Sequence, residues 1–197
     1  LEPYGGQVLG MNVGATTSLT ATFAAGGLIG FGWASGVLSR GADPFRMAAG
    51  GALLGIPAFI AVLLAAPMGS IPIFGAGVLL VGLGGGIFSH GTLTATMNSA
   101  PKEQIGLALG AWGAVQATAA GVAVALGGIL RDVVSALAAR GFFGESLAVP
   151  ATGYAAVYAL EIALLLATTA AMATLIGSQP RGAHPRPFTE EYERRSS

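Results

Sequence analysis

The residues of this chain that could do chemistry are few, and they lie inside long apolar segments. His90 is the only histidine in such a segment, and Gly86 and Thr94 lie four residues before and after it. Residues four apart stack on one face of a helix, so these three form a single stripe. A stripe of bare backbone, imidazole and hydroxyl suits close contact with another helix or with a flat ligand better than contact with lipid.

Two roles are open for His90. The imidazole can form a hydrogen bond across a pair of helices, which is a common use of polar side chains inside membrane bundles. A neutral imidazole nitrogen is also the commonest metal ligand, and the candidate here is the magnesium of a chlorophyll, with neighbouring glycines making room for the flat macrocycle. Both roles are consistent with the sequence.

Like His90, Glu161 is a polar residue that is energetically unfavourable inside a membrane, because it lies near the middle of another apolar segment. Helical spacing places it on one face with Tyr154 and Tyr158. A bare carboxylate at membrane depth is expensive, so it should face protein or water, or be protonated. We therefore expect either a structural hydrogen bond to a neighbouring helix or a group that lines a cavity or a proton-coupled site.

Trp112 and Gln116 lie one helical turn apart in a third apolar segment and are weaker candidates for ligand contact. Trp112 is close enough to the end of its segment to be an ordinary interface anchor. Arg40, Asp43 and Arg46 form a charged group that we interpret as an ionic cluster anchoring a loop.

Several function classes have no support in the sequence. We find no P-loop, no HExxH, no GxSxG and no Asp-rich pair of the kind that holds magnesium diphosphate, so we predict that the protein is not an enzyme. No basic patch with interleaved aromatic residues is present, and we expect no nucleic-acid partner. The chain has no cysteine, which excludes disulfides and thiolate metal sites.

The composition is typical of an integral membrane protein. Of the 197 residues, 53% are hydrophobic and only 9% are charged, against about 25% charged residues in a soluble domain. Mean hydropathy is +0.72. The 32 glycines favour tight helix–helix contact, because membrane helices associate through close backbone packing.

Five apolar runs are long enough to cross a membrane, each with about 20 residues or more. The sequence thus predicts an all-α membrane protein of about five transmembrane helices within residues 15–176. We expect residues 1–14 to be an interfacial loop that closes a preceding helix, and residues 177–197 to be a polar cytoplasmic tail. The predicted spans are about Ala15–Leu38, Arg46–Ala66, Ile71–Met97, Ile105–Leu130 and Gly153–Ile176, with a separate short surface helix at Asp132–Arg140.

The basic residues predict the orientation. Arg40, Arg46, Lys102 and four arginines of the tail fall on one side of the five-span arrangement, and Arg131 and Arg140 fall on the other. Basic residues concentrate in cytoplasmic loops, so the tail is predicted to be cytoplasmic and the connection from Arg131 to Thr152 to face outward.

Four separated segments, in the same order, resemble the PucC/LhaA family, the bacteriochlorophyll-delivery branch of the major facilitator superfamily. The resemblance covers residues 1 to about 176. The segments that carry it are LEPYGGQVLG at residues 1–10, GTLTA at 91–95 after Phe88, Arg131-Asp132 with PATGY at 150–154, and LEIA at 160–163.

The resemblance implies a partial major-facilitator-like bundle. Family members have twelve spans in two halves, and the five predicted here correspond to the eighth through twelfth. Transport by a facilitator requires both halves to rock around a midplane site, and this chain supplies less than one half.

The resemblance also implies a function, which is assembly of bacterial light-harvesting antenna complexes in the inner or intracytoplasmic photosynthetic membrane. The implied cofactors are bacteriochlorophyll or a carotenoid. The implied partners are the light-harvesting α and β polypeptides, the reaction centre–light-harvesting core complex and the lipid membrane. Gly86, His90, Thr94, Trp112, Gln116, Tyr158 and Glu161 are the candidate pigment-binding residues. The alternative is a major-facilitator transporter of a small amphiphile, proton-coupled through Glu161.

Overall fold

The computed structural model describes residues 1–178, and within them the chain is all-α with five helices long and apolar enough to cross a membrane. The multi-pass membrane character predicted from composition is confirmed. The helices are α1 (Glu2–Gln7), α2 (Val13–Leu38), α3 (Pro44–Ala65), α4 (Ile71–Ser99), α5 (Ile105–Ala139) and α6 (Ala151–Ser178), and two short 3-10 turns lie at Lys102–Gln104 and Glu145–Leu147. The predicted tail, residues 177–197, lies almost wholly outside the described residues.

Local sequence signals set where the helices begin. Asn12 caps α2 by accepting a hydrogen bond from Ala15 N at 2.8 Å. Asp43 caps α3, where its Oδ1 accepts from Phe45 N at 2.7 Å and from Arg46 N at 3.1 Å, and Pro44 occupies the first helical position. Such caps satisfy backbone N–H groups that have no partner within the helix.

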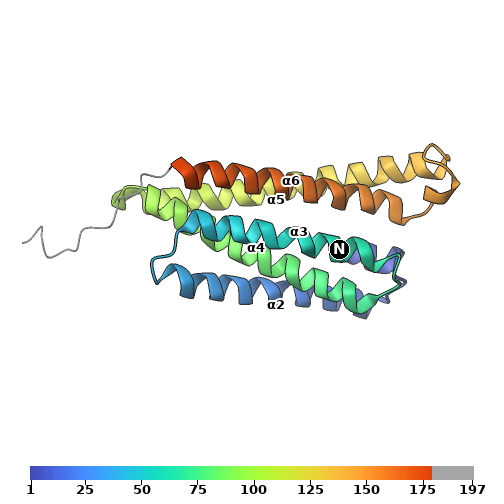
Figure 1. The fold of residues 1–197 in the computed structure, drawn as a ribbon, viewed down its shortest axis with the longest axis horizontal. Helices are drawn as coiled ribbons and strands as arrows, with labels where there is room; N and C mark the ends of the chain where they lie inside the picture. Colours follow the sequence, from blue (N-terminus) through green and yellow to red (C-terminus); the bar gives the residue numbers. More distant parts are fainter. Residues whose placement is uncertain (179–197) are drawn as a thin grey trace, which may run out of the picture.

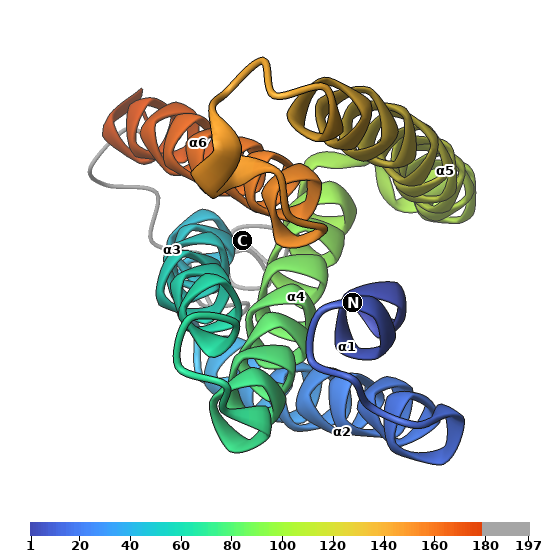
Figure 2. The ribbon, with the colours of Figure 1, turned by 90° about the vertical axis from the view of Figure 1, so that its right-hand side faces the viewer.

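Helix α4 lies at the centre of the bundle, with α2 and α3 packed on two of its faces (Figure 2). Glycines make both contacts possible. A Cβ at Gly82 or Gly86 would overlap the backbone of α2, and a Cβ at Gly91 would lie 2.7 Å from Ala48 N of α3. Gly30 of α2 meets the backbone of Leu83 in the same way. The α2–α4–α3 layer is therefore joined by backbone-to-backbone contact, as expected for glycine-rich membrane helices.

The α5–α6 hairpin forms the other part of the bundle (Figure 1). We predicted that the fourth span ends near Leu130 before a separate short helix, and this was wrong, because α5 runs unbroken to Ala139. Its 35 residues correspond to roughly 50 Å, well beyond a hydrocarbon core of about 30 Å. The charged Arg131-Asp132 pair thus lies in the part of the helix that projects past the apolar stretch.

The expected loop at residues 1–14 also contains a helix, α1, whose Tyr4 is 2% exposed. The Tyr4 ring packs on Phe74 of α4 and on Tyr154 and Tyr158 of α6, with ring centroids 5.3–5.4 Å apart. Its hydroxyl donates to Val62 O of α3 at 3.3 Å. Burial raises the pKa of Tyr4, which keeps this hydroxyl a neutral donor. One aromatic side chain therefore connects α1 with three spanning helices.

The connections alternate between two ends of the bundle (Figure 1). The α2–α3 and α4–α5 connections, with Arg40, Arg46 and Lys102, lie at one end, which we call the basic end. The α3–α4 and α5–α6 connections lie at the opposite end, with Arg131 and Arg140 nearby. This alternation agrees with the five-span arrangement, and the cytoplasmic placement of the basic end stays a prediction.

We expect cysteines placed at Ser39 and at Ser146 to be labelled from opposite faces of the membrane. Both positions are exposed in connections at opposite ends of the bundle, and Ser39 lies at the basic end. In right-side-out vesicles a membrane-impermeant maleimide should label the Ser146→Cys protein and leave the Ser39→Cys protein unlabelled until the vesicles are opened. Labelling of both positions from the same face would contradict the five-span arrangement.

Candidate functional site

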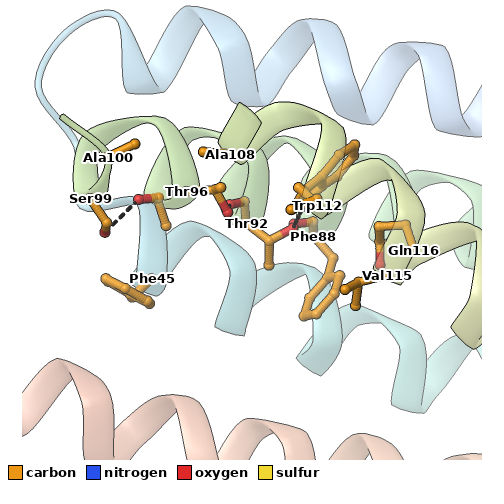
Figure 3. Close-up of a pocket in the computed structure, with 12 residues that line it drawn as sticks. Phe45, Phe88, Thr92, Thr96, Ser99, Ala100, Ala108, Trp112, Val115 and Gln116 are labelled. Atoms are coloured by element: carbon orange, nitrogen blue, oxygen red, sulfur yellow. Dashed lines mark hydrogen bonds between the residues drawn. The ribbon is translucent and has the colours of Figure 1, made fainter. Parts of the chain in front are cut away.

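A large cavity opens between α4 and α5 near the basic end, with Phe45 of α3 at its side (Figure 3). Its volume of about 710 Å³ is in the range of small-molecule sites, which is about 300–1,000 Å³. It is lined by Phe45, Phe88, Thr92, Ala95, Thr96, Ser99, Ala100, Ala108, Ala111, Trp112, Val115 and Gln116. We call it the α4–α5 cavity. Two predicted site residues, Trp112 and Gln116, lie in its wall.

The polar side chains in this wall are mostly used within the protein. Trp112 Nε1 donates to Thr92 Oγ1 at 3.2 Å, which joins α5 to α4. The Thr92 hydroxyl is 3.1 Å from Phe88 O, the Thr96 hydroxyl donates to Thr92 O at 2.9 Å, and the Ser99 hydroxyl donates to Ala95 O at 2.8 Å.

These bonds leave a wall that behaves as an apolar surface, since its indole and hydroxyl donors are already engaged. Gln116 is the exception in this wall, because its carboxamide forms no hydrogen bond with residues 1–178. A carboxamide offers both donors and acceptors, so the cavity provides one polar anchoring point on an otherwise apolar surface.

His90 lies on a different face of α4. It is two residues from both Phe88 and Thr92, and residues two apart on a helix do not share a face. Its ring packs edge-on against Phe31 of α2, with the centroids 4.2 Å apart. Among residues 1–178, His90 Nδ1 is the one buried side-chain nitrogen or oxygen without a hydrogen bond.

The unpartnered Nδ1 could bind a ligand or accept a hydrogen bond from a group outside the described residues. Magnesium ligation by His90 stays a prediction. The surrounding space fits a macrocycle less well than the sequence indicated. Gly86, which we expected to make room, lies against Gly27 O and Phe31 N of α2 instead. Gly86 is therefore a helix-packing residue, which confirms the helix-contact interpretation of this part of the stripe. Thr94 is partly buried on α4 and is not among the residues that line the α4–α5 cavity.

Tyr158 and Glu161 lie away from the α4–α5 cavity, on α6. Tyr158 is 6% exposed and packs against Tyr4 and Phe59, so it belongs to the aromatic core. Glu161 is partly buried, and the structure gives its carboxylate no ion pair or hydrogen bond with residues 1–178. Its predicted role as a cavity or proton-coupled group stays a prediction. The seven predicted site residues therefore do not form one site.

A second polar group at the end opposite the basic end was missed by the sequence analysis. Tyr154 OH donates to Gln7 Oε1 at 2.8 Å and lies 3.3 Å from Arg131 Nη1, while Arg131 pairs with Asp132 at 2.6 Å. These contacts connect α1, α5 and α6 across a separation of up to 147 residues in the sequence. No spacing rule reaches that far, so only the fold reveals the group.

The cavity residues Thr92 and Thr96 were also missed as lining groups, although the sequence held a signal for them. They lie four residues apart on α4, like Trp112 and Gln116 on α5. Two such pairs on consecutive helices are the pattern that could have predicted a shared wall.

Comparison with known proteins places the chain in a family. The family model described as PUCC protein matches residues 1–179. A Protein PucC from Cereibacter sphaeroides is 57% identical over 178 residues, which are 90% of this chain and 38% of that protein. A Protein PucC from Rhodovulum sulfidophilum is 63% identical over 134 residues, which are 68% of this chain and 30% of that protein.

A further relative, an uncharacterized protein in the puhA–bchM intergenic region of Rhodobacter capsulatus, is 52% identical over 176 residues. These are 89% of this chain and 37% of that relative. The chain thus spans less than two fifths of the length of the curated relatives named here. No solved structure is significantly similar to it. The match of the family model over nearly the whole described chain, with relatives above 50% identity, shows that the chain belongs to the PucC family.

Proposed function

We propose that the full-length protein is a non-enzymatic assembly factor for bacterial light-harvesting antenna complexes, which handles bacteriochlorophyll or carotenoid together with the antenna polypeptides. Family membership supports the biological setting, since the PucC/LhaA family is implicated in antenna assembly. The observation that carries the binding role is the α4–α5 cavity, which is large enough for a small-molecule ligand and mainly apolar in its wall.

The side chains of the cavity and of His90 would make different kinds of contact with a pigment. Phe45, Phe88 and Val115 offer apolar contact to a hydrocarbon part of a pigment, and Gln116 offers one hydrogen-bonding group. His90 carries the unpartnered nitrogen on the other face of α4. A chlorophyll, when bound, supplies light absorption and a magnesium ion that accepts a nitrogen ligand. The protein residues bind and orient it and exclude water.

The transporter alternative requires Glu161 to face a path for substrate or protons. Glu161 is not among the residues that line the α4–α5 cavity, so this cavity lends the transporter no support. We therefore keep the assembly factor as the single proposed function.

The full-length protein, purified in a mild detergent from a phototrophic host, is expected to retain pigment and to be coloured. The absorption spectrum and the pigment-to-protein ratio measure this directly. A colourless protein from cells that assemble normal antenna would contradict pigment handling.

The same spectrum should be measured for the His90→Leu variant of the full-length protein. Leucine preserves the apolar helix and removes the imidazole nitrogen. Because His90 lies outside the α4–α5 cavity and packs against Phe31, we expect this variant to keep the pigment absorption of the parent, whereas loss of bacteriochlorophyll absorption would make His90 a magnesium ligand. An unchanged spectrum would assign His90 to helix packing and leave the cavity as the binding element. The membrane level of the variant must equal that of the parent, since a lower level indicates a packing defect.

A further inference from the structure

A second groove lies near the basic end, between α2 and α3, and its floor is apolar. Met47 and Leu54 of α3 and Ile87 of α4 form the floor, and Trp33, Asp43 and Arg46 are among the residues around it. Its volume is about 560 Å³. Helices α2 and α3 make little direct contact with each other, and Ile87 of α4 lies between them at the groove. We call it the α2–α3 groove.

Arg46 at this groove carries a charge that the described residues leave unpaired. The single salt bridge within residues 1–178 is Arg131–Asp132 at the other end, and the structure gives the Arg46 guanidinium no hydrogen bond. Arg46 also occupies the first turn of α3, where the helix dipole disfavours a cation. A cation in this place is stabilised by an anion that approaches the same helix end.

Asp43 is the acidic group that faces Arg46, and its carboxylate is already in use. Its Oδ1 accepts hydrogen bonds from the backbone N–H groups of Phe45 and Arg46 as the cap of α3. The salt-bridge distance to the Arg46 side chain is not reached. Among the residues that line the groove, Arg46 is therefore the basic group, and the one acidic group, Asp43, is engaged as the helix cap.

Trp33 completes the pattern of an interfacial lipid site. Its side chain is 57% exposed, and it lies on α2 less than two turns before the basic connection. Tryptophan with exposed rings concentrates at the level of lipid headgroups, and basic pockets between membrane helices bind anionic headgroups. The apolar floor beneath the charged rim fits an acyl chain.

We propose that the α2–α3 groove binds one anionic phospholipid, with its phosphate at Arg46 and an acyl chain along Met47, Leu54 and Ile87. The site is separate from the α4–α5 cavity and does not depend on the proposed function. The occupant is an intact lipid and not free phosphate, because more of the residues that line the groove are apolar than charged.

The glycine at position 50 gives a way to fill the groove without disturbing the helices. A Cβ at Gly50 meets no atom within 4 Å, and Gly50 lines the groove. Gly50→Leu should therefore block the acyl chain and preserve the fold. Gly75 of α4 also has open space around an added Cβ and does not line the groove, so Gly75→Leu is the matched control.

The test measures lipid retained by the full-length protein after extraction from vesicles of equal parts phosphatidylglycerol and phosphatidylcholine, by native mass spectrometry. We expect one phosphatidylglycerol to be retained in preference to phosphatidylcholine. Arg46→Gln should lower this retention about fivefold, in line with the attraction of one basic residue to an anionic headgroup. Arg46→Lys should restore most of it, and Arg140→Gln, at the other end, should leave it unchanged.

Gly50→Leu should abolish selective retention while Gly75→Leu preserves it. Equal retention of both lipids by the parent protein would overturn the proposal, as would parental retention in both Arg46→Gln and Gly50→Leu. Displacement of the lipid by glycerol phosphate alone would also overturn it, because the acyl chain would then contribute nothing. Elution of each variant as a single folded species separates loss of binding from loss of fold, and Arg46→Gln and Gly50→Leu perturb different contacts.

Discussion

Replacing Gly86 with leucine in the full-length protein is expected to remove nearly all folded protein from the membrane. A Cβ at this position would overlap Gly27 O of α2 and approach Phe31 N at 2.9 Å. Both obstacles are backbone atoms of a helix, so no rotamer change can relieve the overlap. Overpacking that side chains can absorb costs about 1–3 kcal/mol, and separation of two backbones should cost more than about 3 kcal/mol.

Gly85→Leu is the control for this experiment, since it adds the same side chain one residue away. A Cβ at Gly85 meets nothing within 4 Å. The yield of protein that elutes as a single folded species after extraction should therefore fall for Gly86→Leu and stay near the parental level for Gly85→Leu. Equal yields for the two variants would contradict the packing of α4 on α2.

Filling the α4–α5 cavity should abolish antenna assembly and leave the protein in the membrane. Ala108 lines the cavity on α5, and Ala108→Phe adds an aromatic ring to its wall. Because the cavity is open and apolar, the ring replaces a ligand without a buried polar group losing a partner. We expect the yield of mature antenna to fall at least tenfold, measured by the near-infrared absorption of membranes.

Ala114→Phe, on the same helix and exposed outside the cavity, should give the parental antenna yield. Both variants must be present in membranes at the parental level for the comparison to apply. Normal antenna in the Ala108→Phe strain would separate this cavity from the assembly function, although membership of the family would stand.

The helices could be predicted from the sequence because membrane thickness and hydrogen bonding within each helix determine them locally. The end of α5 was mispredicted for the same local reason. Arg131 and Asp132 interrupt the apolar run, but no residue between them and Ala139 breaks a helix, so α5 continues to Ala139.

The sequence predicted that glycines make close helix–helix contacts, but it did not show which glycines make them. Two glycine pairs on α2, Gly26/Gly30 and Gly32/Gly36, have the same four-residue spacing. A Cβ at Gly30 would overlap α4, whereas a Cβ at Gly32 meets nothing within 4 Å. Spacing defines a face and does not say which face has a neighbour. In the candidate site, Trp112 and Gln116 were predicted, and Thr92 and Thr96 had the same spacing on α4. That the two pairs share one wall depends on the distance between α4 and α5, which the whole bundle sets.

The unequal contacts of α4 have a mechanical consequence. The backbone of α4 is in direct contact with the backbones of α2 and α3. In contrast, Cβ atoms added at Gly106, Gly110 and Gly113 of α5 would meet nothing within 4 Å. Helices whose backbones are in direct contact, such as α2, α3 and α4, move together. A contact made only by side chains, such as that between α4 and α5, separates more easily. Besides this side-chain contact, α5 is joined to α4 by the short connection at residues 100–104. Widening of the α4–α5 cavity would require the Trp112–Thr92 hydrogen bond to open and would leave the glycine contacts intact. A ligand that widens this cavity would therefore break one hydrogen bond between side chains and no contact between backbones.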